Sequence, residues 1–117
     1  MADLNKDIAK IIAETYDTNK RVSEDDPEFW GSFLNFANQA TKEGALPYKM
    51  KELIALAVAI NDHCKFCISV HLKAAVDAGA SRKEIMEAAY VAVLMGGGPS
   101  MAYLRYVIDG CDQFCTE

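Results

Sequence analysis

The chain lacks long hydrophobic runs. Its longest apolar stretch, LIALAVAI at residues 53–60, has eight residues and is far too short to span a bilayer. The N-terminal segment MADLNKDIAKIIAETYD carries a charge every few positions, so it does not match the apolar core of a secretory signal peptide. We therefore expect a cytoplasmic protein with no membrane partner.

Dense clusters of Lys and Arg are also missing. The 12 basic residues are outnumbered by 17 acidic ones, giving a formal net charge of −5, and no stretch could follow a phosphate backbone. We therefore expect no nucleic-acid partner. Linkers, repeats and low-complexity tracts are absent, which predicts a single domain over residues 1–117 with its core at about 25–110. A chain of 117 residues buries enough surface to fold without a disulfide.

Strand-like alternation is nearly absent, and the apolar residues recur at helical spacing. Two start signals stand out: Pro27 follows Asp26, and SRKE at residues 81–84 reads as a capping box. The pattern predicts an all-α fold of about six helices, at residues 4 to about 20, 27 to about 44, 47–60, 64–79, 81–95 and 99 to about 115.

Two of these helices are predicted to supply the core. The second has an aromatic face that we expect to be buried, made of Phe29, Trp30, Phe33, Leu34 and Phe36. The third becomes apolar on all sides, which predicts a helix buried all round. The glycines of GGGPS at residues 96–100 fit either a tight turn between helices or a bare backbone beside a functional site.

The segment NDHCKFCISVH at residues 61–71 carries the chemically most suggestive residues. On a helix that begins near Cys64, the side chains of Cys64, Cys67 and His71 share one stripe. Thiols in a first helical turn lie near unpaired N–H groups, which favour the thiolate. In a helical hairpin that turns at Asp62, Glu52 faces His71. Carboxylate, imidazole and thiol would then form a proton-transfer chain.

Each of these residues also has a simpler interpretation. Glu52 alone could be a solvated carboxylate, and His71 alone a hydrogen-bonded histidine of an interface. A close cysteine pair in a reducing compartment is either redox-active or metal-binding. A zinc site would use Cys64, Cys67 and His71, with Glu52 or His63 as the fourth ligand.

The stretch ELIALAVAINDHCKFCISVH at residues 52–71 resembles the signature of the alkylhydroperoxidase D-like branch of the carboxymuconolactone decarboxylase family. That signature is Glu, eleven residues, Cys-x-x-Cys, three residues, His, and Glu52, Cys64, Cys67 and His71 occupy its four positions. The likeness extends over about residues 25–110, including GGGPS.

The resemblance implies an all-helical enzyme that forms homo-oligomers, often trimers or hexamers, and needs no cofactor or metal. It implies that Cys67 attacks an organic hydroperoxide or disulfide substrate, and that Cys64 resolves the product as a disulfide. A lipoyl-bearing or thioredoxin-like dithiol would then regenerate the pair. We expect Cys64, at the exposed start of its helix, to be the cysteine that the reductant attacks.

Two features qualify the resemblance. Well-studied peroxidase members carry a histidine directly before the second cysteine, where this chain has Phe66; His63 could compensate, although as the direct neighbour of Cys64 it is expected to point elsewhere. The decarboxylase branch, which acts on a lactone, is the other enzymatic alternative, but it lacks the cysteine pair. A second pair, Cys111 and Cys115, has a spacing of four that rarely closes a disulfide, and we assign it no role.

Overall fold

The computed structural model describes residues 4–116 and, from Asp7 onward, their side chains. Of the predicted domain 1–117, residues 1–3 and 117 lie outside the described residues. The described part has no strand, which confirms the predicted all-α fold. Its helices are α1 (Leu4–Asp25), α2 (Pro27–Thr41), α3 (Tyr48–Asn61), α4 (Lys65–Asp77), α5 (Arg82–Gly96) and α6 (Gly98–Phe114). None of these helices is long and apolar enough to cross a membrane.

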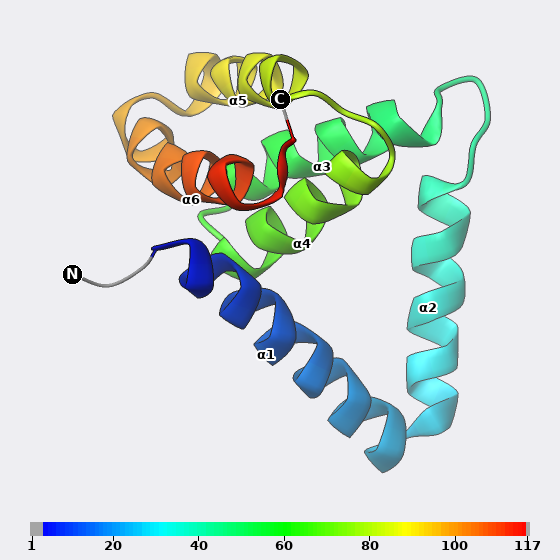
Figure 1. The fold of residues 1–117 in the computed structure, drawn as a ribbon. Coiled ribbons are helices and arrows are strands. Elements are labelled where there is room, and N and C mark those ends of the chain that lie inside the picture. The colour runs from blue at the N-terminus through cyan, green and yellow to red at the C-terminus, as the bar shows by residue number, and fades with distance from the viewer. Residues whose placement is uncertain (1–3, 117) are drawn as a thin grey trace.

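Helices α3 to α6 form the body of the molecule and share one hydrophobic core (Figure 1). Each of the four contributes side chains that are shielded completely from solvent, and such burial is the main favourable contribution to folding. The largest of them are Leu56, Ile60, Ile68, Leu72, Ile85 and Val107.

Helices α1 and α2 form a V beside this body (Figure 1). The α1 arm packs against α4 and α6 and buries Ile8, Ile11 and Ile12 beside Tyr106 and Phe114. The α2 arm stands away from the body, and its main contacts are with α1 and α3. The radius of gyration, 14.5 Å, accordingly exceeds the value of about 13 Å expected for a compact chain of this length.

The prediction that the aromatic face of α2 belongs to the core is wrong for a single chain. No residue of α2 is buried, and Phe36 exposes 67% of its surface. The start of the helix is as predicted, because the Asp26 carboxylate accepts the Phe29 N–H at 3.0 Å. Helical spacing identifies the apolar side of a helix, but it does not show whether another element of the same chain covers that side.

The prediction that α3 is buried all round is also wrong. One side of the helix carries Leu53, Leu56 and Ile60 into the core, whereas Ile54 and Val58 on the other side are about half exposed. The exposed side borders an apolar groove between α3 and α5. In a helix that is apolar on every side, the sequence alone gives no face preference, and the positions of the neighbouring helices decide which side is covered.

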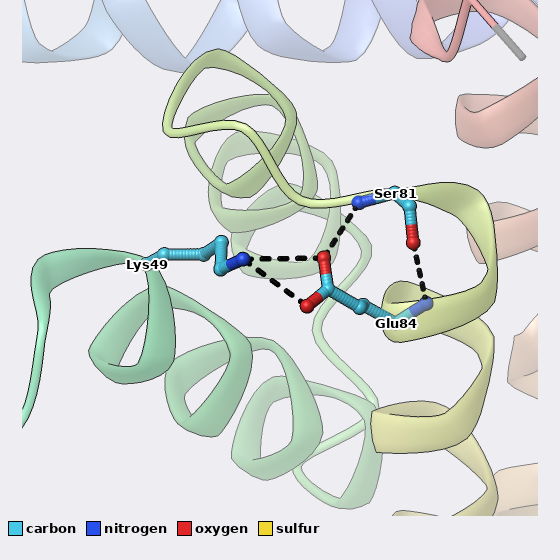
Figure 2. Close-up of polar contacts among 3 residues, drawn as sticks. All are labelled: Lys49, Ser81 and Glu84. Carbon is cyan, nitrogen blue, oxygen red and sulfur yellow. Dashed lines mark hydrogen bonds and ion pairs between the residues drawn. The ribbon is translucent and has the colours of Figure 1, made fainter.

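A polar cluster ties the first turn of α3 to the first turn of α5 (Figure 2). The Ser81 hydroxyl accepts the Glu84 N–H at 3.1 Å, and the Glu84 carboxylate accepts the Ser81 N–H at 2.9 Å, so the predicted capping box is confirmed. Lys49 Nζ reaches the same carboxylate at 3.1 Å. The hydrogen bond from Ser81 and the contact with Lys49 lower the pKa of Glu84 below its usual value. This cluster holds the start of α3 one turn before Glu52.

The end of α3 is tied to α6 at the glycine segment. The buried Ser100 hydroxyl donates a hydrogen bond to the Asn61 side chain, and the backbone of Gly96 packs directly against both residues. Gly97 has φ +72 between the two helices, a left-handed conformation that suits glycine. The predicted tight turn is confirmed, and the bare backbone of Gly96 gives Asn61 room three residues before Cys64.

Candidate active site

The turn between α3 and α4 positions the cysteine pair. Asp62 ends α3, the backbone of His63 adopts φ 55, and the Cys64 N–H returns to the Ala59 carbonyl at 3.3 Å. Cys64 is the N-cap of α4, and its sulfur accepts the N–H of Cys67 at 3.3 Å. A thiol here takes the place of the usual Ser, Thr or Asp oxygen, which fixes the direction of the Cys64 side chain.

The two sulfurs lie side by side as free thiols. Cys64 Sγ and Cys67 Sγ are 2.9 Å apart and share a hydrogen bond. A disulfide bond is about 2.05 Å long, so the pair could be oxidised with little movement of the backbone. This arrangement is the one predicted from the helical spacing.

The expected preference of both sulfurs for the thiolate is wrong for Cys67. Partial burial of the thiol, its hydrogen bond with Cys64, and the charges of Cys64 and Asp62 together raise the pKa of Cys67 to about 11. The backbone N–H of Cys67 is one of the first-turn groups that were expected to favour the thiolate, and it is directed at the sulfur of Cys64. Two adjacent thiols also cannot both ionise easily. Cys67 therefore needs a base to become a nucleophile at neutral pH.

Glu52 and His71 provide a candidate for that base. The Glu52 carboxylate is almost completely buried, with 3% of the residue exposed, and its Oε1 lies 2.7 Å from Nδ1 of His71. The predicted facing of these residues across the hairpin is confirmed, and the alternative of a solvated Glu52 is wrong. When Nδ1–H donates to the carboxylate, Nε2 of the neutral ring is left as a proton acceptor.

The Glu52–His71 pair opens into a hollow of about 670 Å³ between the V of α1 and α2 and the body of the molecule. Tyr48, one turn before Glu52 on α3, lines the same hollow. Burial raises the pKa of Tyr48, and so do the negative charge of Glu52 and a hydrogen bond with it. Sequence reasoning missed Tyr48, although its spacing of four from Glu52 places both residues on one helical face.

The cysteine pair and the Glu52–His71 pair are neighbours without a direct bond. Cys67 precedes His71 by one helical turn on α4, and among the described residues no hydrogen bond joins either sulfur to His71. Cys67 is exposed, whereas Cys64 is only partly so. Cys64 is therefore less exposed than expected for the start of its helix, and its sulfur accepts the N–H of Cys67. That the reductant attacks Cys64 stays a prediction.

His63 turns away from this pair. Its ring stacks on Tyr103 of α6, with ring centroids 4.7 Å apart and an angle of 15° between the planes. This position agrees with the expectation that His63 points elsewhere. Phe66 stands directly before Cys67, at the position where the resemblance led us to look for a relay histidine. Lys65 Nζ lies 5.5 Å from the centre of the Phe66 ring.

The donor atoms do not favour the alternative of a metal site. Over the part of the chain that the structure describes, no three His, Cys, Asp or Glu side chains are arranged to hold a metal ion. His71 directs Nδ1 to Glu52 and not to the sulfurs. A tetrahedral zinc site needs four donors around one point, and these residues instead form two separate pairs.

The second cysteine pair lies far into the C-terminal half of α6. Cys111 is completely buried in the core, and Cys115 is the C-cap of the helix. Burial raises the pKa of Cys111 to about 12, and the charge of Cys115 acts in the same direction. No polar contact links this pair to the candidate active site in the described residues, and the structure suggests no role for it.

The raised pKa of Cys111 predicts a loss of stability at alkaline pH. The folded protein holds this proton up to about pH 12, whereas a thiol with the ordinary value of 9.0 loses it earlier. The contribution of the protonated Cys111 thiol to the free energy of unfolding is therefore complete below about pH 9 and is lost between about pH 9 and 12. We expect the Cys111→Ala variant to lose less unfolding free energy than the wild type between pH 8 and 10.5 in urea titrations. Parallel pH profiles of the two proteins would contradict this expectation.

Comparison with known proteins places this geometry in context. The sequence model of the carboxymuconolactone decarboxylase family matches residues 27–109. A family protein from Legionella pneumophila has a similar crystal structure, with 34% identity and a TM-score of 0.90 over 94% of this chain and 98% of its own. A Thermotoga maritima family protein, with a suggested involvement in the antioxidative response, has 30% identity and a TM-score of 0.78 over 89% and 88%. Uncharacterized protein 4 of the Paracoccus denitrificans cox locus is 37% identical over 70% of this chain and 74% of its own.

Proposed function

Because the chain belongs to the carboxymuconolactone decarboxylase family, we propose that it is a thiol-dependent peroxidase and disulfide oxidoreductase of the alkylhydroperoxidase D-like branch. The observation that carries the proposal is the position of two free sulfurs 2.9 Å apart, one helical turn from a histidine held by a buried glutamate. The suggested antioxidative involvement of the Thermotoga maritima relative supports it.

The reaction begins with a proton transfer from Cys67. Nε2 of His71 accepts the proton of the Cys67 thiol, directly or through one water, while Glu52 holds Nδ1 and stabilises the imidazolium that forms. The buried carboxylate has His71 as its hydrogen-bonded partner, so the pair can hold a proton without leaving an isolated charge in the interior. The raised pKa of Cys67 is the reason that this base is needed.

The electrons then pass from sulfur to oxygen. The Cys67 thiolate attacks the terminal oxygen of a hydroperoxide, the O–O bond breaks, and the alcohol leaves with the proton held by His71. Cys67 becomes a sulfenic acid. Cys64 attacks this sulfur, a disulfide forms, and water leaves. The adjacent position of Cys64 makes the second step intramolecular and therefore fast.

A dithiol completes the cycle by thiol–disulfide exchange. We propose a lipoyl-bearing or thioredoxin-like reductant, as in the proteins that the motif resembles, and a cytoplasmic location in which such dithiols keep the pair reduced. In the reduced pair Cys67 is the more exposed cysteine, and Cys64 borders the pocket between α4 and α6.

Replacing Glu52 with glutamine tests the proton-transfer pair. Glutamine keeps the size of the side chain but cannot stabilise an imidazolium, so we expect Cys67 to react with hydroperoxide about 10- to 100-fold more slowly at neutral pH. The apparent pKa of Cys67, measured as the pH profile of alkylation, should rise. Glu87→Gln, at an exposed position on α5, is the matched control. If Glu52→Gln leaves the pH profile of alkylation unchanged, Glu52 has no part in the reaction.

We also propose that the protein forms a homo-oligomer, such as a trimer or hexamer. The apolar side chains that α2 leaves exposed in one chain, Phe29, Phe33, Leu34 and Phe36, support this proposal, because monomers rarely leave such a group uncovered. Light scattering at micromolar concentration should give a multiple of 12.9 kDa, and Phe33→Ser should lower the mass. A wild-type mass of one chain would contradict the proposal.

A further inference from the structure

A pocket of about 480 Å³ lies beside Cys64, between the start of α4 and helix α6. It is lined by His63, Cys64, Lys65, Phe66, Tyr103 and Tyr106. This volume is in the range of about 300–1,000 Å³ that small-molecule sites occupy. It is too small for a folded partner, and Cys64 forms part of its wall.

Aromatic rings form most of the lining. Tyr103 stacks on His63 at 4.7 Å and contacts Tyr106 with ring centroids 5.7 Å apart. The three rings are therefore connected, and Phe66, which is 42% exposed, stands on the α4 side of the pocket. Flat, apolar groups pack well on such surfaces, because aromatic faces attract ring edges and conjugated systems.

The backbone of His63 supports a dedicated role for this wall. Its φ of 55 lies in the left-handed region, which only a few per cent of residues other than glycine occupy, His more often than most. The parallel stacking with Tyr103 holds the ring at the edge of the pocket in spite of that cost. The five-residue stretch from Asp62 to Phe66 thus supplies both the cysteine and one aromatic wall.

We infer that this pocket binds the organic group of the hydroperoxide and selects hydroperoxides with a flat aromatic or conjugated group. The inference rests on the proposed function. Since the two sulfurs are 2.9 Å apart, a group seated beside Cys64 can direct its O–O bond at Cys67. The electrons and the proton then move as in the peroxidase step, and the organic group leaves as an alcohol. Tyr103 is a specificity-determining residue in this scheme.

Kinetics with two hydroperoxides test the inference. We expect the wild type to have a lower KM for cumene hydroperoxide, which has a phenyl ring, than for tert-butyl hydroperoxide. Tyr103→Leu should raise the KM for cumene hydroperoxide about tenfold, so that the difference between the KM values of the two substrates is lost. Tyr103→Phe should restore the wild-type values, and Tyr90→Leu, at an exposed position outside the pocket, is the control. Equal KM values for the two substrates in the wild type would overturn the inference while leaving the proposed function intact.

Ligand binding to a variant without the two cysteines tests the pocket separately from the proposed peroxidase activity. In the Cys64→Ser/Cys67→Ser variant, cumyl alcohol, the product of cumene hydroperoxide, should shift the NMR signals of the Tyr103 and Tyr106 rings, and Tyr103→Leu should remove the effect. If the wild type reduces no hydroperoxide but these shifts appear, the pocket remains a binding site and the proposed function fails. If cumyl alcohol leaves both rings unshifted, the pocket is not the site.

Discussion

Replacing Cys67 with serine is expected to abolish the reaction with organic hydroperoxides, whereas Cys64→Ser still reacts once and then stops. The two sulfurs lie together in one hydrogen bond, yet only Cys67 is one helical turn from His71. Without Cys64, the sulfenic acid on Cys67 has no adjacent thiol to condense with. Stopped-flow measurement of hydroperoxide consumption should therefore show no reaction in the first variant and one equivalent in the second.

Dimedone labelling of both variants, followed by peptide mapping, identifies the sulfur that reacts. A label on Cys67 in Cys64→Ser supports the assignment. A label on Cys64 in Cys67→Ser, with none in the converse variant, would reverse the two roles. A zinc site predicts a different result, since loss of either ligand would release metal and destabilise the fold. No label in either variant, with zinc bound to the wild type, would refute the redox function.

Gly96→Ala is expected to destabilise the fold strongly, although Gly96 lies outside the core. A methyl group at this position would overlap the side chains of Ser100 and Asn61. Either the Ser100–Asn61 hydrogen bond breaks, or α5 moves away from the ends of α3 and α6. Overpacking of this kind costs about 1–3 kcal/mol, and a broken hydrogen bond at the buried Ser100 adds about 1 kcal/mol. Urea titration measures the sum directly.

Gly31→Ala is the matched control for this substitution. Gly31 lies within α2, and an added methyl group there would meet no atom within 4 Å. Alanine is the better helix former, so this variant should be more stable than the wild type by about 0.5–1 kcal/mol. If the two variants changed stability by the same amount in the same direction, the crowding at Gly96 would not be the cause.

The number and order of the helices could be predicted from the sequence because the start and stop signals are local. Asp26 caps α2 through its own side chain, and Ser81 and Glu84 cap α5 within one turn. The hairpin at Asp62 could be predicted for the same reason, and with it the contact between Glu52 and His71. Each of these features depends on residues whose separation along one or two helices sets their distance in space.

The failures concern properties that depend on other elements of the fold. The aromatic face of α2 has the period of a core helix, but nothing in the described chain covers it. The pKa of Cys67 is raised mainly by burial and by the hydrogen bond with Cys64, and the first-turn N–H points to the sulfur of Cys64 instead. The pocket beside Cys64 combines α4 with Tyr103 of α6, and no pattern in the sequence relates two segments about forty residues apart.

Mass spectrometry of alkylated protein, with and without one equivalent of an organic hydroperoxide, tests the central claim most directly. Before oxidation, alkylation under denaturing conditions should label all four cysteines. After oxidation, we predict that Cys64 and Cys67 escape labelling and form one disulfide-linked peptide, that Cys111 and Cys115 are still labelled, and that native spectra show no metal in either state. Unchanged labelling of Cys64 and Cys67 after hydroperoxide treatment would contradict the account.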